Sequence, residues 1–314
     1  MTAGSRIIID AGQTGTRVRV HRSDGHDDHD AEPVYTDRPV VEQVAAIART
    51  VLAPSSGPVS ALAAGVSGLT PDYARPDSLL AMVSDLGITA VVLAHDSVSA
   101  YLAANRFADG VTCAVGTGVV ALGVGPAGTW RVDGWGHLVG DAGSAYWIGR
   151  AGIDAALRSF DGRTEPSPLE DSAVETFGPL PELYMSLQGA PDRVARIAGF
   201  ATQVDDAARG GDATAIDICR RAAAELATSA SAALHRSGWS SGRDARISWM
   251  GNVLSHNDLI RETFADEMIR RAPGATVGAP LGTSLDGVDL LLALPPEHAL
   301  TASVARAAAQ WSCP

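Results

Sequence analysis

The chain has 314 residues, and its 36 acidic and 24 basic side chains give a formal charge of −12. All of the basic residues are arginines. The lack of lysine excludes P-loop nucleotide binding, protein-kinase chemistry, and Schiff-base or pyridoxal enzymes, because each of these needs a lysine. The acidic balance argues against a nucleic-acid partner, since phosphate backbones are bound by a basic face.

The cysteines and the apolar segments indicate where the protein works. Cys113, Cys219 and Cys313 are widely spaced and form no C-x-x-C pair, which indicates a reducing compartment and no metal cluster. No basic segment followed by an apolar run opens the chain, so we expect no signal peptide. The most apolar stretch, 111–124, contains several glycines and is too short to cross a bilayer. We therefore expect a soluble, cytoplasmic protein without a membrane partner.

The first half of the chain has the pattern of alternating strands and helices. A buried strand at 7–9 ends in Asp10, and a glycine-containing turn leads into a second, alternating strand at 16–20. The acidic, histidine-containing segment 23–30 is expected to be a turn. The elements expected to follow are a strand at 33–35, a helix at 41–52, a strand at 59–64, a helix at 77–86, a strand at 90–94 and a helix at 96–105.

The pattern then restarts with a strand at 111–115, a Gly-Thr-Gly turn and a strand at 119–124. Two such units predict two similar α/β domains, 1–110 and 111–314, which offer their glycine hairpins to a shared cleft. The second half is rich in helical patterns, which we expect to include an insertion. The expected elements are a helix at 143–158, short helices between 169 and 210, a helix at 212–237, a strand at 247–250, a helix at 257–271 and helical patterns at 287–294 and 297–310.

The run D-A-G-Q-T-G-T-R, from Asp10 to Arg17, carries the strongest chemical signal. An aspartate at a strand end can hold a hydrated Mg²⁺, because hard cations prefer carboxylate and water oxygens. The small residues after it allow backbone N–H groups to approach phosphate oxygens, and Thr14 and Thr16 add hydroxyl donors. An ordinary hairpin turn is the alternative. A second turn, Gly116-Thr117-Gly118, gains weight as a phosphate site because it repeats the first.

These motifs together resemble the nucleotide signature of the sugar kinase, actin and heat-shock chaperone superfamily. The run G-W-G-H-L-V-G-D-A-G-S-A-Y-W-I at 134–148 is similar to that of N-acetylglucosamine kinases in the acyl-CoA dehydratase activator (BadF/BadG/BcrA/BcrD-type) ATPase group. Ile197–Phe200 and Arg209–Asp212 also match this group. The resemblance implies two duplicated ribonuclease-H-like (actin-like ATPase) domains with an interdomain cleft, Mg²⁺ and ATP as cofactors, and a homodimer.

The resemblance also implies roles for individual residues. Asp10 would hold Mg²⁺ through water. Asp96, at the head of a helix, would be the catalytic base and contact the sugar, although an aspartate there can also be only a helix cap. Gly134, Trp135 and Asp141 would contact the sugar, with helix capping as the alternative for Asp141. The residues implied to bind ATP are Gly12, Gln13, Thr14, Thr16, Arg17, Gly116, Thr117, Gly118, Gly251 and Asn252.

The chain departs from the group's pattern in three places. Ala142 stands where the group has Glu or Gln, Val119 replaces a serine, and Thr36-Asp37-Arg38-Pro39 replaces a loop that carries asparagine. The expected activity is ATP-dependent phosphorylation of an amino sugar, at the 6-hydroxyl of N-acetylglucosamine or glucosamine. The alternatives are a catalytically inactive sugar or nucleotide sensor and an activator ATPase, which would need cysteines placed to share an iron–sulfur cluster.

Overall fold

The computed structural model describes residues 5–12, 15–35, 37–52 and 59–309. These residues divide between two compact units. Unit 1 combines the chain up to residue 108 with the chain from residue 280 onward, and unit 2 is 109–279. Within the described residues, no helix has the length and apolar character that crossing a membrane requires.

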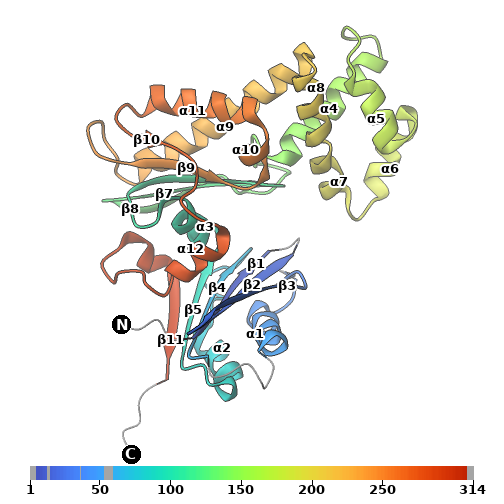
Figure 1. Ribbon diagram of the computed structural model, residues 1–314. Helices are drawn as coiled ribbons and strands as arrows, with labels where there is room; N and C mark the ends of the chain where they lie inside the picture. The colour runs from blue at the N-terminus through green and yellow to red at the C-terminus, as the bar shows by residue number, and fades with distance from the viewer. Residues whose placement is uncertain (1–4, 13–14, 36, 53–58, 310–314) are drawn as a thin grey trace, which may run out of the picture. The chain divides into compact units, whose positions relative to one another are not determined.

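A six-stranded sheet, in the order β11-β5-β4-β1-β2-β3, forms the centre of unit 1 (Figure 1). β1, β4 and β5 run parallel, and the pairs β1–β2, β2–β3 and β5–β11 are antiparallel. The strands are β1 (Arg6–Ala11), β2 (Thr16–Arg22), β3 (Gly25–Ala31), β4 (Ala61–Val66), β5 (Ala90–His95) and β11 (Val304–Ala308).

Helices cover both faces of this sheet. Successive strand residues point to opposite faces, and consecutive residues such as Ile7, Ile8 and Ile9 are all buried. Ile7 and Ile9 belong to the buried cluster that also contains residues of α1 (Val40–Val51) and α2 (Pro76–Val83). Gly65 faces the other side, where a Cβ would lie 2.4 Å from Ser99 Oγ of α3 (Asp96–Asn105) and 3.0 Å from Val288 of α12 (Ser284–Leu290). The short 3₁₀ helices are Ser84–Leu86 and Ala299–Ser303.

Unit 2 repeats this sheet. Its order is β10-β9-β6-β7-β8, which matches β5-β4-β1-β2-β3 strand for strand, including the parallel central pair and the antiparallel meander. The predicted duplication of a ribonuclease-H-like α/β fold is therefore confirmed. The strands are β6 (Gly110–Val115), β7 (Val119–Gly125), β8 (Gly128–Val132), β9 (Arg246–Met250) and β10 (Thr276–Val277).

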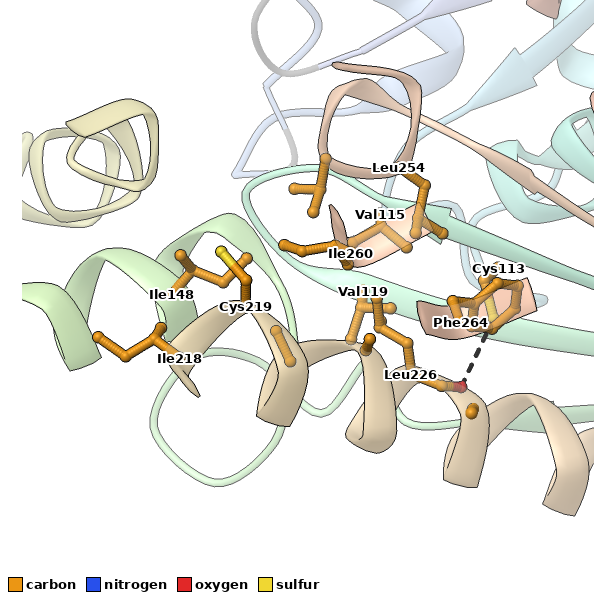
Figure 2. Packing of buried hydrophobic residues seen from close by; sticks show 14 of the residues in the cluster. Cys113, Val115, Val119, Ile148, Ile218, Cys219, Leu226, Leu254, Ile260 and Phe264 are labelled. Atoms are coloured by element: carbon orange, nitrogen blue, oxygen red, sulfur yellow. Dashed lines mark hydrogen bonds between the residues drawn. The ribbon is translucent and has the colours of Figure 1, made fainter. Parts of the chain in front are cut away.

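The helices of unit 2 include an insertion between β8 and the long helix α9, which packs against the sheet (Figure 1). The inserted helices are α4 (Ala145–Phe160), α5 (Leu169–Phe177), the 3₁₀ helix Leu180–Glu182, α6 (Leu183–Gly189), α7 (Arg193–Gly199) and α8 (Ala201–Arg209). The others are α9 (Ala213–Arg236), α10 (Asn252–His256) and α11 (Asp258–Arg271). Figure 2 shows their shared core, where Cys113 of β6 lies with Leu226 of α9 and Phe264 of α11.

The structure differs from three local predictions. The segment expected to be a turn contains β3, and no strand occurs at 33–35. β3 lacks an apolar pattern, but it pairs with β2 along its length, and Arg19 binds Asp28 across the pair at 2.7 Å. The helical pattern at 297–310 contains β11, because pairing with β5 overrides the helix propensity of its alanines.

The end of the chain also lies elsewhere than expected. The sequence pattern assigned all of 111–314 to the second domain. In the structure the described residues from 280 onward belong to unit 1, because β11 pairs with β5 and α12 packs against α3. A sequence pattern contains no signal for this return, since neither element has a distinctive spacing.

Candidate active site

Two aspartates lie at the carboxyl edge of the unit 1 sheet. The register pairs Ala11 with Val66 and Val66 with His95, so β1, β4 and β5 end side by side. Asp10 is the penultimate residue of β1, and Asp96 directly follows β5 as the first residue of α3. In open α/β sheets, ligands bind outside the carboxyl ends of the strands, so this edge is where a reaction centre is expected.

The Asp96 carboxylate is held ionised by its neighbours. Burial raises its pKa, but the bond and charge of His95, the Ser67 hydroxyl and the Ser97 N–H together outweigh this effect, and the net pKa lies below the ordinary value. His95 Nδ1 lies 2.8 Å from Asp96 Oδ1. The side chain of Asp96 is nevertheless 40% exposed, so its oxygens remain accessible to a ligand.

Asp96 is not the N-cap of α3. That position belongs to His95, whose Nδ1 accepts a hydrogen bond from the Ser97 N–H at 3.1 Å. A ring nitrogen accepts when unprotonated and donates when protonated, so His95 Nδ1 serves either Ser97 or Asp96 at one time. The capping explanation for an aspartate at this position therefore does not apply to this helix.

Asp10 has the opposite electrostatic environment. Burial raises its pKa above the ordinary value, the nearby Ser284 hydroxyl opposes that shift, and the charge of Asp96 raises the pKa further. Two carboxylates that raise each other's cost of ionisation favour a cation between or beside them. The described residues include no group of three or more histidine, cysteine or acidic side chains that could hold a metal ion. The carboxylates of Asp10 and Asp96 fit Mg²⁺, because this ion keeps several waters and uses one or two protein carboxylates.

The first glycine hairpin joins β1 to β2 beside Asp10. Gly12 N–H donates to Gly15 O at 3.1 Å, and the predicted ligands Gln13 and Thr14 lie outside the described residues. Thr16 is buried, and its hydroxyl oxygen has no hydrogen-bond partner in the described part of the chain. Arg17 is exposed on β2 opposite Asp10. The hairpin thus offers a spare buried hydroxyl and an accessible guanidinium.

A pocket of about 500 Å³ in unit 2 brings together three of the predicted nucleotide ligands, Gly116, Thr117 and Asn252. α4 begins on the Gly-Thr-Gly turn, since Ala145 N–H donates to Gly116 O at 2.9 Å. The other lining residues come from α4, α7, α8, α10, α11 and their junctions, and are Ala145, Ile148, Ala195, Ala198, Gly199, Ala201, Thr202, Asp205, Val253, His256, Asn257 and Ile260.

The composition of this pocket suits a flat ring with polar edges. Ala198, Gly199 and Ala201 are small and leave one wall open, while Asp205 and Asn257 supply polar groups. The motif Ile197–Phe200 had marked this wall as similar to the kinases without giving it a role. Asp205 was not predicted at all; its carboxylate pairs with Arg209 at 2.8 Å on α8.

Gly251 is required by the backbone beside this pocket. Its φ is +92°, and a Cβ would lie 2.3 Å from Val115 O at the end of β6. Only glycine allows β9 to turn into α10 so close to β6, and that turn sets the position of Asn252.

The loop at 133–143, which carries Gly134 and Trp135, is organised by a residue that the sequence did not reveal. The Asp133 carboxylate accepts N–H bonds from Gly134 and Asp141 at 2.8 Å and from Ala142 at 3.1 Å. Trp135 projects from this loop with 72% of its surface exposed. An aspartate just before a glycine-rich run is the only signal that could have identified Asp133.

Asp141 joins this loop to the Gly-Thr-Gly turn. It is 7% exposed; burial raises the pKa of its carboxyl group, and the backbone groups of Val119 and Gly136 only partly oppose this shift. A Cβ at Gly118 would lie 2.7 Å from Asp141 Oδ2, so the turn packs directly on the carboxylate. Asp141 does not cap α4, because Ser144 holds that position. Its contact with a sugar stays a prediction.

A second pocket, of about 520 Å³, lies in unit 1, and it reaches the segment that follows β4. Its lining includes Asp37 and Arg38, from the loop that departs from the kinase pattern, and Gly68, which follows the Asp96 neighbour Ser67. Thr36 lies outside the described residues. The remaining lining residues are Pro39, Val40, Val41, Glu42, Thr70, Tyr73, Arg75, Ser78 and Met82.

The chain is similar to known proteins over most of its length. Residues 9–286 match the BadF/BadG/BcrA/BcrD ATPase family. The chain belongs to this family. A curated relative, the N-acetylmuramic acid/N-acetylglucosamine kinase of Clostridium acetobutylicum, is 29% identical over 180 residues, which are 53% of this chain and 56% of the relative. The chain thus spans about half the length of the curated relative that it matches.

Several solved structures share the fold of this chain. A proposed N-acetylglucosamine kinase from Chromobacterium violaceum superposes with a TM-score of 0.69 at 24% identity, covering 92% of this chain and 98% of that one. A proposed N-acetylglucosamine kinase from Porphyromonas gingivalis gives 0.69 at 19% identity, over 90% and 97%. A glucokinase of the ROK family from Streptomyces griseus gives 0.51 at 19%, over 92% and 99%. These likenesses establish the actin-like ATPase fold.

Proposed function

We propose that this family member is an ATP-dependent amino-sugar kinase. It would transfer the γ-phosphate of ATP to a hydroxyl, the 6-hydroxyl, of N-acetylglucosamine or glucosamine. The observation that carries the proposal is Asp96: an accessible carboxylate with a lowered pKa at the edge of the sheet, close to Asp10, in a unit that also holds a pocket large enough for a hexose.

In the proposed reaction the acceptor hydroxyl donates a hydrogen bond to the Asp96 carboxylate. As the O–P bond forms, the hydroxyl becomes acidic, and its proton passes to Asp96 while ADP leaves with the electrons of the broken bond. The low pKa of Asp96 suits a base that orients the hydroxyl early and takes the proton late. Ser67 and His95 keep the carboxylate ionised and aimed.

The remaining groups would bind the nucleotide and its metal. Asp10 would hold Mg²⁺ through water, and the metal would neutralise charge on the phosphates. Thr16 and Arg17 of the first hairpin would bind phosphate oxygens. The unit 2 pocket beside Gly116, Thr117 and Asn252 has the volume and the small-residue wall that an adenosine group requires.

The acceptor would be bound partly by residues that match related kinases and partly by residues that differ from them. Gly134 and Trp135 are proposed sugar contacts, and Asp37, Arg38 and Arg75 add charges of both signs to the pocket of unit 1. The curated relative is named for both N-acetylmuramic acid and N-acetylglucosamine, and only the former carries a carboxylate. The arginines make N-acetylmuramic acid an acceptor worth testing here.

The environment of Cys113 and Cys219, the cysteines among the described residues, argues against the activator-ATPase alternative. Burial raises the pKa of Cys113 to about 12 and that of Cys219 to about 11. Iron–sulfur clusters are held by thiolates, which such sites disfavour. Cys113 and Cys219 instead fill the core of unit 2, as Figure 2 shows.

The experiment that tests the proposal measures ADP formation from Mg·ATP with and without each candidate sugar. A kinase forms ADP only when an acceptor is present, whereas an activator ATPase forms it at the same rate without one. A sensor binds the sugar but forms no ADP. Acceptor-dependent ADP formation supports the proposal, and either of the other two patterns contradicts it.

A further inference from the structure

A second pocket of unit 2, of about 670 Å³, has no part in the proposed reaction. It is a groove between α4 and α9. Trp147, Arg150, Ala151, Asp154, Ala155 and Arg158 line it from α4; Thr214, Ile218 and Arg221 line it from α9; and Thr164 lines it from the intervening loop.

The charge of this groove is opposite to that of the protein. Three arginines and one aspartate line it, in a chain whose formal charge is −12. Arg158 pairs with Asp154 at 2.7 Å on α4, and Arg221 pairs with Asp217 at 2.8 Å on α9. Both pairs are exposed, and each joins residues of a single helix. Exposed ion pairs contribute little to the stability of the fold, so a ligand anion can replace the aspartate as the partner of the arginine. No ion pair joins Arg150 to an acidic group of the described chain.

The spacing of the lining residues places them on one face of α4 and on one face of α9. Arg150, Asp154 and Arg158 recur every fourth residue on α4, and Thr214, Ile218 and Arg221 share one face of α9. The Arg221 guanidinium lies 5.7 Å from the centroid of the Trp147 ring, so the indole supports it at the wall of the groove. Arginines held in this way bind phosphate through paired N–H groups.

The groove is also much larger than a phosphate ion, so the ligand must carry a further body. Its lining includes the threonines Thr164 and Thr214 and the apolar residues Ala151, Ala155 and Ile218. This mixture suits a sugar ring, which presents both O–H groups and C–H faces. We propose that the groove is a second binding site for a phosphorylated sugar, with the phosphate held by Arg150 and Arg221.

The choice of a phosphorylated sugar rests on the proposed function, because such a compound would be the product. The groove also lies on the helix that lines the candidate nucleotide pocket. Trp147 faces the groove and Ile148, the next residue of α4, lines the other pocket. Figure 2 shows Ile148 of α4 near Ile218 and Cys219 of α9.

The test is calorimetric titration of the full chain with glucosamine 6-phosphate. Unphosphorylated glucosamine and a non-hydrolysable ATP analogue are present at saturation to occupy the reaction site. The test variant combines Arg150→Ala and Arg221→Ala in one protein. The control variant is Arg163→Ala, because Arg163 is an exposed arginine that pairs with Asp161 outside the groove. Inorganic phosphate is titrated separately.

We expect the wild type and the control to bind glucosamine 6-phosphate equally, and the double variant to bind at least tenfold more weakly with an unchanged unfolding midpoint. Inorganic phosphate should bind at least tenfold more weakly than the sugar phosphate. Binding that is absent in the wild type, or unaffected by the double substitution, would overturn the site. Equal affinity for inorganic phosphate would overturn the sugar as its ligand. None of these results depends on catalysis, so they leave the proposed kinase activity to its own test.

Discussion

His95 Nδ1 lies 2.8 Å from Asp96 Oδ1, and the same nitrogen also faces the Ser97 N–H that begins α3. His95 therefore connects the helix start to the carboxylate that we propose as the base. Its bond and charge, with the Ser67 hydroxyl and the Ser97 N–H, hold the pKa of Asp96 below the ordinary value despite burial. A positioning role for His95 follows from this geometry.

Replacing His95 with alanine should lower kcat roughly tenfold, the effect of losing about one hydrogen bond to a charged group. Loss of His95 also raises the pKa of Asp96, so the acid limb of the kcat profile should move to higher pH. His95→Asn places an amide near the position of Nδ1 and should recover much of both effects. A profile that does not move in His95→Ala would show that His95 only caps the helix.

Asp10 should be costly for folding and necessary for metal use. Burial raises its pKa in the folded state, so its ionisation destabilises the fold as pH rises through that value. Asp10→Asn should therefore raise the unfolding midpoint of the metal-free protein at pH 7. This gain should vanish once the pH falls below about 3.9, the ordinary pKa of aspartate.

The same variant should lose Mg²⁺-dependent use of ATP, because the cation loses its carboxylate. Thermal unfolding across pH and ATP turnover across Mg²⁺ concentrations measure the two effects. Asp24→Asn, at an exposed aspartate of the turn between β2 and β3, is the control and should change neither. An Asp10 variant with lower stability and unchanged Mg²⁺ dependence would remove Asp10 from the metal site.

Alanine substitutions at Gly251 and Gly242 distinguish the cost of backbone strain from the cost of a steric clash. Both have φ near +90°, but a Cβ at Gly251 would lie 2.3 Å from Val115 O, whereas one at Gly242 meets nothing within 4 Å. Gly242→Ala should cost about 1–2 kcal/mol of unfolding free energy. Gly251→Ala should cost about 1–3 kcal/mol more. It should also weaken ATP binding, because it displaces Asn252. Equal losses in the two variants would show that the turn can relax away from β6.

Acceptor selectivity should be broad where the chain departs from related kinases. A site rejects an analogue strongly when its own polar groups are left unpaired, and Ala142 has removed one such group. We expect glucosamine to be a competent acceptor. The test is kcat/KM for glucose, glucosamine, N-acetylglucosamine and N-acetylmuramic acid. A preference for N-acetylglucosamine of about a thousandfold over all three, about 4 kcal/mol, would contradict this expectation.

A restored side chain provides the matched comparison. Ala142→Glu should increase discrimination among these sugars, whereas Leu138→Glu adds the same charge to an exposed position of the loop and should not. Equal effects of the two substitutions would trace any change to charge alone.

Local motifs predicted much of the fold and of the candidate site. Asp10 and Asp96 each follow an apolar strand, so parallel pairing alone brings them to one edge of the sheet. The two glycine turns revealed the duplicated fold because their strand context repeats. The prediction of the duplicated fold is confirmed, and the roles of Asp10 and Asp96 stay predictions.

The remainder depended on contacts between distant segments. Asp133 organises its loop through backbone N–H groups up to nine positions away, and no side-chain pattern reports such bonds. β3 has charged residues where a strand usually shows apolar alternation, and it is stabilised by pairing with β2. β11 returns to unit 1 from the far end of the chain. Only tertiary structure reveals these relationships.

Asp96→Asn tests the proposed base with the least structural change. The amide keeps the size of the side chain but does not accept the hydroxyl proton, so kcat should fall on the order of 10²–10⁴-fold. Calorimetry should show glucosamine binding within a few-fold of the wild type. Wild-type turnover in this variant would remove Asp96 from the role of base.

The central claim is that the γ-phosphate of ATP moves to an amino sugar with the help of Asp96. The most direct measurement follows a label on the γ-phosphate, with glucosamine or N-acetylglucosamine as acceptor, in the wild type and in Asp96→Asn. The account predicts that the wild type transfers the label to the sugar in proportion to the ADP formed, and that the variant transfers it at least a hundredfold more slowly. Label released only as inorganic phosphate, or retained in ATP with every sugar, would contradict it.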